Sequence, residues 1–340
     1  MFKSRLRLSD NNIDLLKQRS RYIIQNKAVF FMKYLVTGGA GFIGSHIVEE
    51  LLARDHDVIL IDNLSTGSIK NIEPFIRHGA VSFIEGSVTD LKLLKDLFED
   101  MDGIFHEAAI PSVPRSLKNP SVTNENNVSG TLNVLIAARD TGIKRVIFAS
   151  SSSVYGDTPV LPKHEDMKPN PKSPYAVSKL CGEYYCRVFS DLYGIKTAAL
   201  RYFNVFGPRQ DPSSEYSAVI PKFISCILRN ESPVIYGDGT QTRDFTYVKD
   251  VVHANIRAME SNTDGIFNVA YGSRISLNDL ARIIMEICDV SMDIKYESPR
   301  PGDVHDSLAD ISAAKKVFNY SPAYTVKTGL EETIRWYKKN

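Results

Sequence analysis

Short apolar runs alternate with amphipathic stretches along the first half of the chain. Runs that predict buried strands lie at Tyr34–Thr37, Asp57–Ile61, Val81–Ile84, Gly103–His106 and Arg145–Ala149. Between them, apolar residues recur at helical spacing over Phe42–Arg54, Asp90–Glu99 and Asn124–Thr141. Strands that alternate with helices predict an α/β fold with a doubly wound parallel sheet.

The alternation weakens after about Phe203, where glycine, proline and aromatic residues become frequent. This change predicts a smaller second lobe, from which some segments return to the first domain before the chain ends. We therefore expect a basic extension over residues 1–31, a nucleotide-binding domain over 32–204 and a second α/β lobe over 205–340.

Composition narrows the class of protein. The 340 residues carry a net charge of +1, which indicates no electrostatic preference for nucleic acid or an anionic membrane. No apolar stretch reaches the ~18–20 residues of a membrane span. The four cysteines have neither zinc-site nor disulfide spacing, so no metal is expected and a reducing cytoplasm is the expected location.

The first 31 residues contain seven basic residues but only Asp10 and Asp14 as acids. Charges interrupt every apolar stretch, so the segment is not a secretory signal. It is either an amphipathic helix, a disordered extension or an over-extended start, with Met32 as a natural first residue.

A glycine-rich turn, Thr37–Gly44, follows the first strand and opens a helix. Glycines allow a tight turn and close approach of the backbone to a pyrophosphate at the helix N-terminus. Asp62 ends the second strand, 18 residues after Gly44, where a carboxylate accepts hydrogen bonds from the adenosine ribose hydroxyls. Asp62 repels a 2′-phosphate and Asn63 offers no neutralising charge, so the predicted cofactor is NAD and not NADP.

Tyr175 and Lys179 lie four residues apart, after Ser173-Pro174, and so occupy one face of a predicted helix. A nearby ammonium and a cationic nicotinamide ring together favour the phenolate of the tyrosine, which makes it a usable base. A serine run, Ser150–Ser153, ends the preceding strand. This set predicts that Tyr175 is a functional base next to a nicotinamide cofactor.

The chain resembles the extended short-chain dehydrogenase/reductases, and among them the UDP-sugar 4-epimerases, over Met32–Tyr337. The matching segments are TGGAGFIG (37–44), DNLSTG (62–67), HEAA (106–109), NNVSGT (126–131), SSSVYG (151–156), SPYAVSK (173–179), RYFNVFGPRQ (201–210), YGDGTQTRDF (236–245) and RPGDVHDSLAD (300–310). The resemblance implies a Rossmann-like domain that binds NAD and a C-terminal lobe that binds the UDP-sugar.

The resemblance also implies roles for individual residues. Tyr175 is the acid/base, Lys179 binds the nicotinamide ribose and tunes Tyr175, and Ser151 hydrogen-bonds the sugar O4. The implied cofactor-binding residues are Gly38, Gly41, Phe42, Ile43, Gly44, Asp62, Asn63, Ser65, Thr66, Gly67, Ser87, Val88, Ala108, Ala109, Asn127, Tyr175, Lys179 and Tyr202. The implied substrate-binding residues are Ser112, Arg115, Ser151, Ser152, Asn204, Val219, Ile220, Tyr236, Arg243, Arg300, Asp303 and Ser307.

Two positions refine the resemblance. Ser87 replaces an aspartate that the family usually carries against the adenine amino group, so we expect a weaker adenine contact. Ser151-Ser152-Ser153 stands where related 4,6-dehydratases carry Thr-Asp-Glu and related decarboxylases a glutamate. Without a carboxylate there, oxidation and re-reduction at C4 is the expected chemistry; a reductase that releases NAD(P)H each turnover, or a redox-sensing binding protein, is the alternative.

The substrate is predicted from Ser307, four residues after Asp303. In the family a tyrosine at this position accompanies UDP-glucose and UDP-galactose, and a small residue accompanies the N-acetyl sugars. We therefore expect interconversion of UDP-N-acetylglucosamine and UDP-N-acetylgalactosamine, with UDP-glucose or UDP-glucuronic acid, the latter suggested by Arg115, as alternatives.

The resemblance also implies a homodimer. Helices around Val113–Thr141 and Tyr175–Tyr193 would form its interface, with Leu117, Val128, Leu132 and Leu135 spaced plausibly for it.

Overall fold

Seven parallel strands form the central sheet of the computed structural model, which describes residues 31–77, 79, 81–212, 218–299 and 305–340. The strand order is β11-β6-β5-β4-β1-β2-β3, and every neighbouring pair is parallel. The strands are β1 (Lys33–Thr37), β2 (Asp57–Asp62), β3 (Val81–Glu85), β4 (Gly103–His106), β5 (Arg145–Ser151), β6 (Lys196–Tyr202) and β11 (Gly265–Val269). The predicted doubly wound α/β fold is confirmed.

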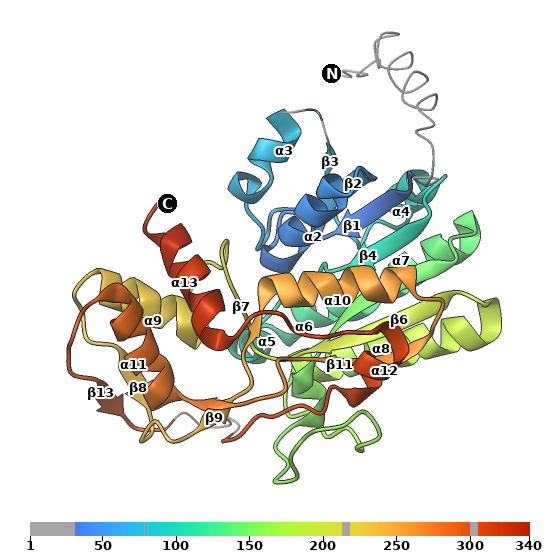
Figure 1. The fold of residues 1–340 in the computed structure, drawn as a ribbon. Coiled ribbons are helices and arrows are strands. Elements are labelled where there is room, and N and C mark those ends of the chain that lie inside the picture. The colour runs from blue at the N-terminus through green and yellow to red at the C-terminus, as the bar shows by residue number, and fades with distance from the viewer. Residues whose placement is uncertain (1–30, 78, 80, 213–217, 300–304) are drawn as a thin grey trace. The chain divides into compact units, whose positions relative to one another are not determined.

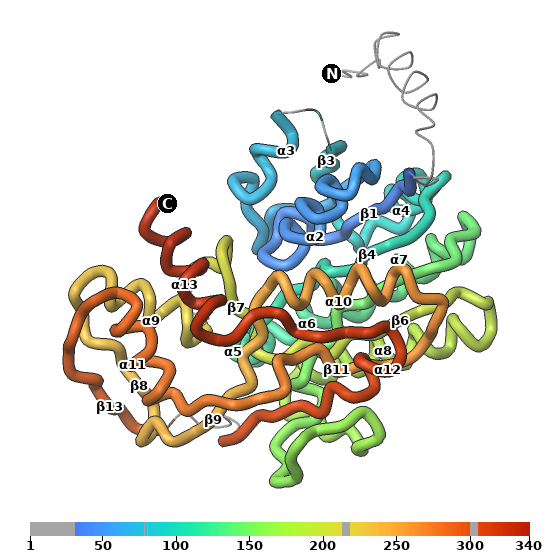
Figure 2. The backbone as a smooth tube through the Cα atoms, in the orientation of Figure 1, coloured from blue at the N-terminus to red at the C-terminus, as the bar shows by residue number. Residues whose placement is uncertain are grey.

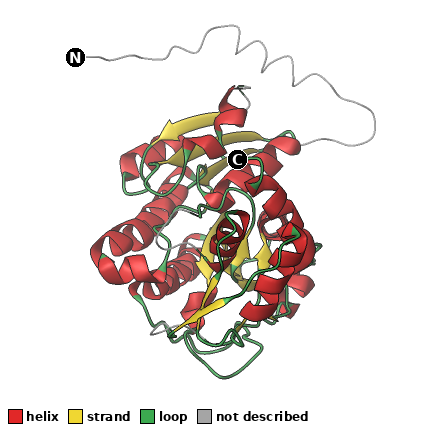
Figure 3. Cartoon of the chain, turned by 90° about the vertical axis from the view of Figure 1, so that its left-hand side faces the viewer, coloured by secondary structure: helices red, strands yellow, loops and turns green. Residues whose placement is uncertain are grey.

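Helices cover both faces of the sheet (Figures 1 and 3). Helix α2 (Phe42–Ala53) packs with α10 (Val248–Glu260) on one face, and α4 (Leu91–Phe98), α7 (Gly130–Thr141) and α8 (Pro174–Tyr193) pack together on the other. Strands β1, β4 and β5 are buried along nearly their whole length, as expected for a sheet covered on both sides.

The carboxyl ends of β1, β4 and β5 lead into the segments that carry the predicted chemistry. After β4 the chain continues through α5 (Val113–Lys118) and α6 (Pro120–Asn124), and after β5 it forms a 3-10 turn, Ser152–Tyr155. A short α3 (Glu73–Arg77) precedes β3. The sheet therefore presents the glycine turn, the serine run and the HEAA segment at one edge.

The predicted helix over Asn124–Thr141 is interrupted. Its first part forms a π-helical turn, Glu125–Ser129, before α7 begins at Gly130. Within this turn Asn127 is buried, and its side chain bonds both the N–H and the C=O of Ile110, at 2.7 and 3.2 Å. Apolar periodicity cannot reveal such a turn, because the spacing of apolar residues is nearly unchanged by it.

The segments after β6, whose backbone is traced in Figure 2, form a second apolar core. It joins α9 (Val219–Leu228), α11 (Leu277–Cys288) and α13 (Val326–Tyr337). Short strand pairs accompany it: β7 (Val205–Phe206) with β10 (Thr246–Tyr247), β8 (Val234–Tyr236) with β13 (Lys295–Glu297), and β9 (Thr242–Arg243) with β12 (Ile275–Ser276).

Three elements that follow residue 205 pair with or pack on the first sheet and its helices. Strand β11 pairs with β6, and α10 packs on α2, β5 and β6, while α12 (Ser312–Phe318) packs on β11. The chain after residue 205 thus contacts the first sheet again, while the domain bounds stay a prediction. The predicted helix within residues 1–31 lies outside the described residues, apart from Phe31.

Within the described residues no helix is long and apolar enough to cross a membrane. The same residues contain no group of three or more His, Cys, Asp or Glu side chains that could hold a metal ion.

Candidate active site

Glycine is required at two positions of the turn between β1 and α2. Gly38 has a φ of +69°, and a Cβ there would lie 2.7 Å from the Ala108 nitrogen. A Cβ on Gly44 would lie 2.2 Å from the Gly38 oxygen. Both distances are far shorter than van der Waals contact, so only glycine lets the turn, α2 and the end of β4 approach this closely. The free N–H groups at the start of α2 are left to face an anion.

Asp62 ends β2 and is 8% exposed. One carboxylate oxygen accepts from the Ala40 N–H at 3.0 Å and the other from the Leu64 N–H at 2.8 Å. Burial raises the pKa of Asp62, while these backbone hydrogen bonds lower it. The carboxylate therefore fixes the glycine turn in addition to being available for ribose hydroxyls.

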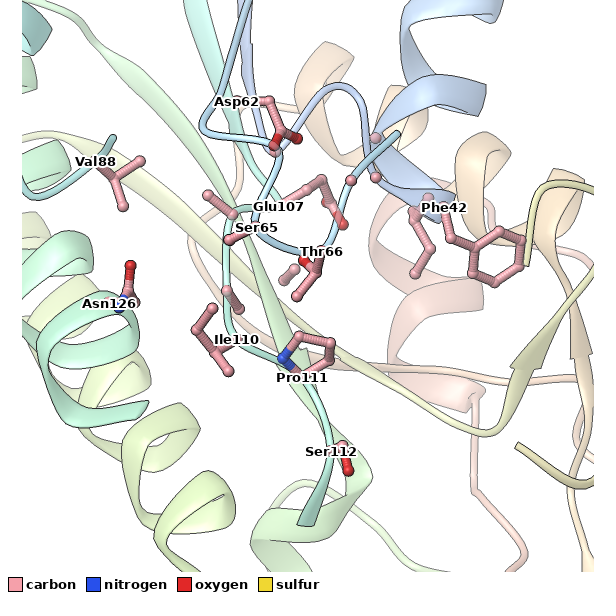
Figure 4. Close-up of a pocket in the computed structure, with 18 of the residues that line it drawn as sticks. Phe42, Asp62, Ser65, Thr66, Val88, Glu107, Ile110, Pro111, Ser112 and Asn126 are labelled. Atoms are coloured by element: carbon pink, nitrogen blue, oxygen red, sulfur yellow. The ribbon is translucent and has the colours of Figure 1, made fainter. Parts of the chain in front are cut away.

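A cavity of about 730 Å³ runs along this edge of the sheet (Figure 4). Every predicted cofactor residue except Asn127 lines it: Gly38, Gly41, Phe42, Ile43, Gly44, Asp62, Asn63, Ser65, Thr66, Gly67, Ser87, Val88, Ala108, Ala109, Tyr175, Lys179 and Tyr202. Asp62, Tyr175 and Lys179 all line this one cavity, as the binding of a dinucleotide requires.

Asn127 and Ser87 make contacts that the sequence did not predict. Asn127 donates to the Ser178 hydroxyl at 3.0 Å as well as bonding Ile110, and its neighbour Asn126 lines the cavity instead. The Ser87 hydroxyl lies 2.8 Å from that of Thr89 and accepts from the Thr89 N–H. Because its hydroxyl already bonds Thr89, Ser87 has less hydrogen-bonding capacity left for an adenine.

Helix α8 positions Tyr175 and Lys179. Ser173 caps the helix by accepting from the Ala176 N–H at 3.2 Å, Pro174 begins it, and Gly194 ends it in the left-handed conformation. The cap fixes the first turn, which carries Tyr175. Lys179 follows one turn later on the same face, and its ammonium nitrogen lies 5.9 Å from the centre of the Tyr175 ring.

Burial governs the protonation of both groups. It lowers the pKa of Lys179 to about 8, and the Lys179 nitrogen donates to the Ala149 carbonyl at 2.7 Å. It also raises the pKa of Tyr175, against a hydrogen bond from Ser151 that lowers it. The effect of burial on the pKa is larger than that of the Ser151 hydrogen bond. The protein by itself therefore favours the neutral phenol of Tyr175. The expected pKa-lowering effect of Lys179 on Tyr175 is not among the causes of this shift.

Three of the predicted substrate residues lie together in the second lobe. Asn204 donates to the Asp244 carbonyl at 2.9 Å and to the Ser307 hydroxyl at 3.5 Å. Ser307 is 7% exposed, and its N–H donates to the Thr242 carbonyl. Arg243 donates to the carbonyls of Thr242 and His305. The guanidinium is thus held in place by main-chain oxygens.

The remaining predicted substrate residues come from several elements. Ser112 and Arg115 line the cavity, and Ser151 and Ser152 follow one another at the end of β5. Val219 and Ile220 begin α9, next to Ala218 in the cavity wall, and Tyr236 ends β8. Arg300 and Asp303 lie outside the described residues.

Two acids that line the cavity, Glu107 and Asp211, were not predicted. Glu107 follows β4 directly, and its carboxylate accepts from the Tyr202 hydroxyl at 2.8 Å. Its place in HEAA, at the end of a predicted strand and before the two alanines of the cofactor site, is the signal that could have found it.

The profile of the NAD dependent epimerase/dehydratase family matches residues 34–270. That span is more than half of the chain and contains the glycine turn, Asp62, Tyr175 and Lys179. The chain belongs to the NAD dependent epimerase/dehydratase family. NAD is therefore the cofactor of the dinucleotide site, and the predicted resemblance to the extended short-chain dehydrogenase/reductases is confirmed.

Similar family members act on UDP-sugars. The structure of a UDP-N-acetylglucosamine 4-epimerase from Methanobrevibacter ruminantium M1, in complex with UDP-N-acetylmuramic acid, is 46% identical, with a TM-score of 0.88 over 91% of this chain and 99% of that one. A UDP-glucose 4-epimerase from Mycolicibacterium smegmatis is 37% identical over 90% of this chain and 99% of its own. A UDP-glucuronate 4-epimerase from Thermodesulfobacterium geofontis is 36% identical over 90% and 96%.

Proposed function

We propose that this NAD-dependent enzyme interconverts UDP-N-acetylglucosamine and UDP-N-acetylgalactosamine by epimerisation at C4. The observation that carries the reaction type is the placement of Tyr175 and Lys179 on one face of α8, in the wall of the cofactor cavity, beside a serine run that holds no carboxylate. The family and the epimerases among its similar members support a UDP-sugar 4-epimerase.

The residues perform two proton transfers. Tyr175 takes the proton of the sugar O4 hydroxyl when C4 is oxidised, and it returns a proton to O4 when C4 is reduced from the opposite face. Ser151 hydrogen-bonds O4 and, through its bond to Tyr175, keeps the phenol directed at that oxygen. Lys179 is positioned to bind the nicotinamide ribose. NAD supplies the chemistry of hydride acceptance and return.

The hydrogen bond from Ser151 and the cationic nicotinamide oppose the effect of burial on the pKa of Tyr175. Burial alone favours the phenol. A base is needed only while oxidised cofactor is present, because that is when O4 loses its proton. The site therefore makes Tyr175 a base in the state in which a base is required.

Ser307 supports the choice of N-acetyl sugars. Its hydroxyl is anchored by Asn204, and its main chain by Thr242, so a small side chain stands at a fixed place in the second lobe. A serine leaves room there for an acetamido group. The similarity to a UDP-N-acetylglucosamine 4-epimerase agrees with this choice.

UDP-glucuronic acid is the second candidate. Arg115 lines the cavity, next to Ser112, whose side chain caps α5 by accepting from the Arg115 N–H at 3.4 Å. A guanidinium at this place suits the carboxylate of a uronate. UDP-glucose is the third, supported by the similarity to UDP-glucose 4-epimerases.

A panel of UDP-sugars, incubated with the purified enzyme and separated by chromatography, tests the proposal. We expect both N-acetyl sugars to interconvert without net oxidation. Tyr175→Phe should lose most of the rate and keep its NAD; wild-type turnover by this variant would refute the assignment.

Ser307→Tyr separates the substrates, with Ser307→Ala as the matched control. The tyrosine should abolish turnover of the N-acetyl sugars and spare UDP-galactose, while the alanine should keep both. An unchanged substrate ratio in Ser307→Tyr would remove Ser307 as the determinant. Preferential turnover of UDP-glucuronic acid, lost in Arg115→Met, would establish the second candidate.

We also propose a homodimer. Helix α8 exposes Val177, Tyr184, Val188 and Leu192 at helical spacing, and α5 and α6, which pack against α8, expose Leu117 and Val122. An apolar surface of this kind is typical of an interface. Of the residues predicted for the contact, Leu117 is 63% exposed, whereas Leu135 is in the core and Leu132 packs against it.

A further inference from the structure

Glu107 is a half-buried acid in the wall of the cofactor cavity, and the proposed chemistry leaves it without a role. Its Oε1 atom accepts from the Tyr202 hydroxyl, which in turn contacts the Asn255 amide at 2.8 Å. Tyr202 ends β6 and Asn255 lies on α10, so two elements hold the carboxyl in place. Figure 4 shows Glu107 among the side chains that surround the cavity.

The described groups that face Glu107 include one cation. Tyr202 donates to it from β6, and Lys179 on α8 lowers its pKa. The Glu107 carboxylate in turn raises the pKa values of Tyr175 and Lys179. Its neighbour on β4, His106, is buried between the hydroxyls of Thr37 and Thr131 and stays neutral, because burial lowers its pKa to about 3. Among the described groups, Lys179 is a cation that lowers the pKa of this carboxyl.

We propose that Glu107 sets the preference of the site for oxidised over reduced NAD. This inference rests on the proposed function, which places the nicotinamide beside Tyr175 and Lys179. The oxidised ring is a cation and the reduced ring is neutral. A carboxylate in the same wall attracts the cation and gains nothing from the neutral ring, so Glu107 stabilises the oxidised form that each new substrate requires.

The coupling is reciprocal. If ionised Glu107 favours binding of the oxidised ring, then the oxidised ring favours ionisation of Glu107. Burial raises the pKa of Glu107 to about 7, so the carboxyl and the carboxylate are both accessible near neutral pH. The cation holds Glu107 ionised. Loss of the cation lets Glu107 take one proton from solvent, in addition to the proton and two electrons that the ring gains as hydride.

This linkage predicts a distinctive pH dependence for the holoenzyme. The equilibrium between bound NAD and bound NADH is measured against a redox buffer by the absorbance and fluorescence of the reduced ring. Just below pH 7, where reduction is coupled to protonation of Glu107, the redox potential should change with pH twice as steeply as in Glu107→Gln. Well above that pH, wild type should favour NAD about tenfold more than the variant, the effect of one pKa unit.

Glu107→Gln keeps an oxygen that accepts from Tyr202 but carries no charge at any pH. At low pH, where Glu107 is protonated, its potential should equal that of wild type. Tyr202→Phe removes the hydrogen bond that lowers the Glu107 pKa, so its steep region should move to higher pH. Glu85→Gln, at the exposed end of β3 on the same edge of the sheet, is the matched control and should follow wild type.

The outcomes distinguish this inference from the function on which it rests. Suppose that both enzymes retain NAD and epimerise UDP-sugars, but that the redox potential changes with pH equally in wild type and Glu107→Gln. This result would overturn the role of Glu107 and leave the proposed function intact. Absence of NAD from the denatured wild-type enzyme, or absence of C4 epimerisation, would instead overturn the proposed function.

Discussion

Lys179 shows that a residue placed for chemistry costs folding free energy. Its ammonium is 4% exposed, and burial lowers its pKa from 10.5 to about 8. The folded protein therefore holds this proton less tightly than the unfolded chain. The resulting destabilisation is fully present below pH 8 and fades as the pH rises from about 8 to 10.5.

Lys179→Met should consequently lose activity without losing stability. The pKa shift is worth about 3 kcal/mol at neutral pH, and the Ala149 carbonyl that loses its donor costs about 1–3 kcal/mol. We expect the free energy of unfolding, measured by urea denaturation, to stay equal or rise by about 1 kcal/mol. Lys196→Met, at a partly exposed position on β6 where the ammonium lies 3.5 Å from Asp264, is the control.

A fall of several kcal/mol in Lys179→Met would contradict this account and indicate that Lys179 is mainly a structural group. The comparison should also be repeated at alkaline pH. There the advantage of methionine should diminish, because wild-type Lys179 is then neutral in the folded protein.

The sequence predicted individual site residues where a motif fixes the backbone around them. The glycine turn, Asp62, Tyr175 and Lys179 all line the cavity because strand ends and a capped helix place them there. Asn127 does not line the cavity, because its side chain bonds Ile110 from the π-helical turn, a contact that its motif does not reveal. The sequence did not predict a role for Glu107, because its hydrogen-bond partner Tyr202 is 95 residues away.

At the scale of elements, the connection between β1 and α2 tolerates almost no added volume. Gly44 lies in the first turn of α2, and the Gly38 carbonyl occupies the space that a side chain would need. Accommodating a methyl group requires α2 to move away from the turn, and this movement withdraws the N–H groups that face the pyrophosphate.

Gly44→Ala should therefore weaken NAD binding by at least about tenfold, or about 1.4 kcal/mol. The measurement is the NAD content of the purified protein, together with titration of the cofactor. Ala53→Gly, at the far end of the same helix, costs about 1 kcal/mol of helix stability and should retain its NAD. Full NAD occupancy in Gly44→Ala would mean that α2 adjusts without moving its N-terminus.

At the scale of the whole molecule, the exposed face of α8 predicts the state of association. Leu192 is 69% exposed and Val188 46%, on a helix whose opposite face is buried against β5 and β6. Leu192→Asp places a charge on this face without touching the core. We expect a monomer by light scattering at concentrations at which wild type is a dimer, with a similar unfolding temperature for the monomeric fold.

The matched control is Leu228→Asp, at a similarly apolar but separate exposed position at the end of α9. It should remain dimeric. A dimer in both variants would place the interface elsewhere, and a monomeric wild type would refute the homodimer itself.

The late return of the chain to the sheet also determines how the protein can be made. Strand β6 is complete at Tyr202, but its neighbour β11 begins only at Gly265. During synthesis, β6 is therefore an unprotected edge strand while more than sixty further residues emerge. Arg145 also lacks its hydrogen-bond partners until this segment is made, because its guanidinium donates to the carbonyls of Ala258 and Thr263. When the ribosome has synthesised the cofactor-binding motifs, the sheet of the cofactor-binding domain is therefore still incomplete. A nascent chain stalled before Gly265 exposes the free edge of β6, which can pair with other chains and cause aggregation.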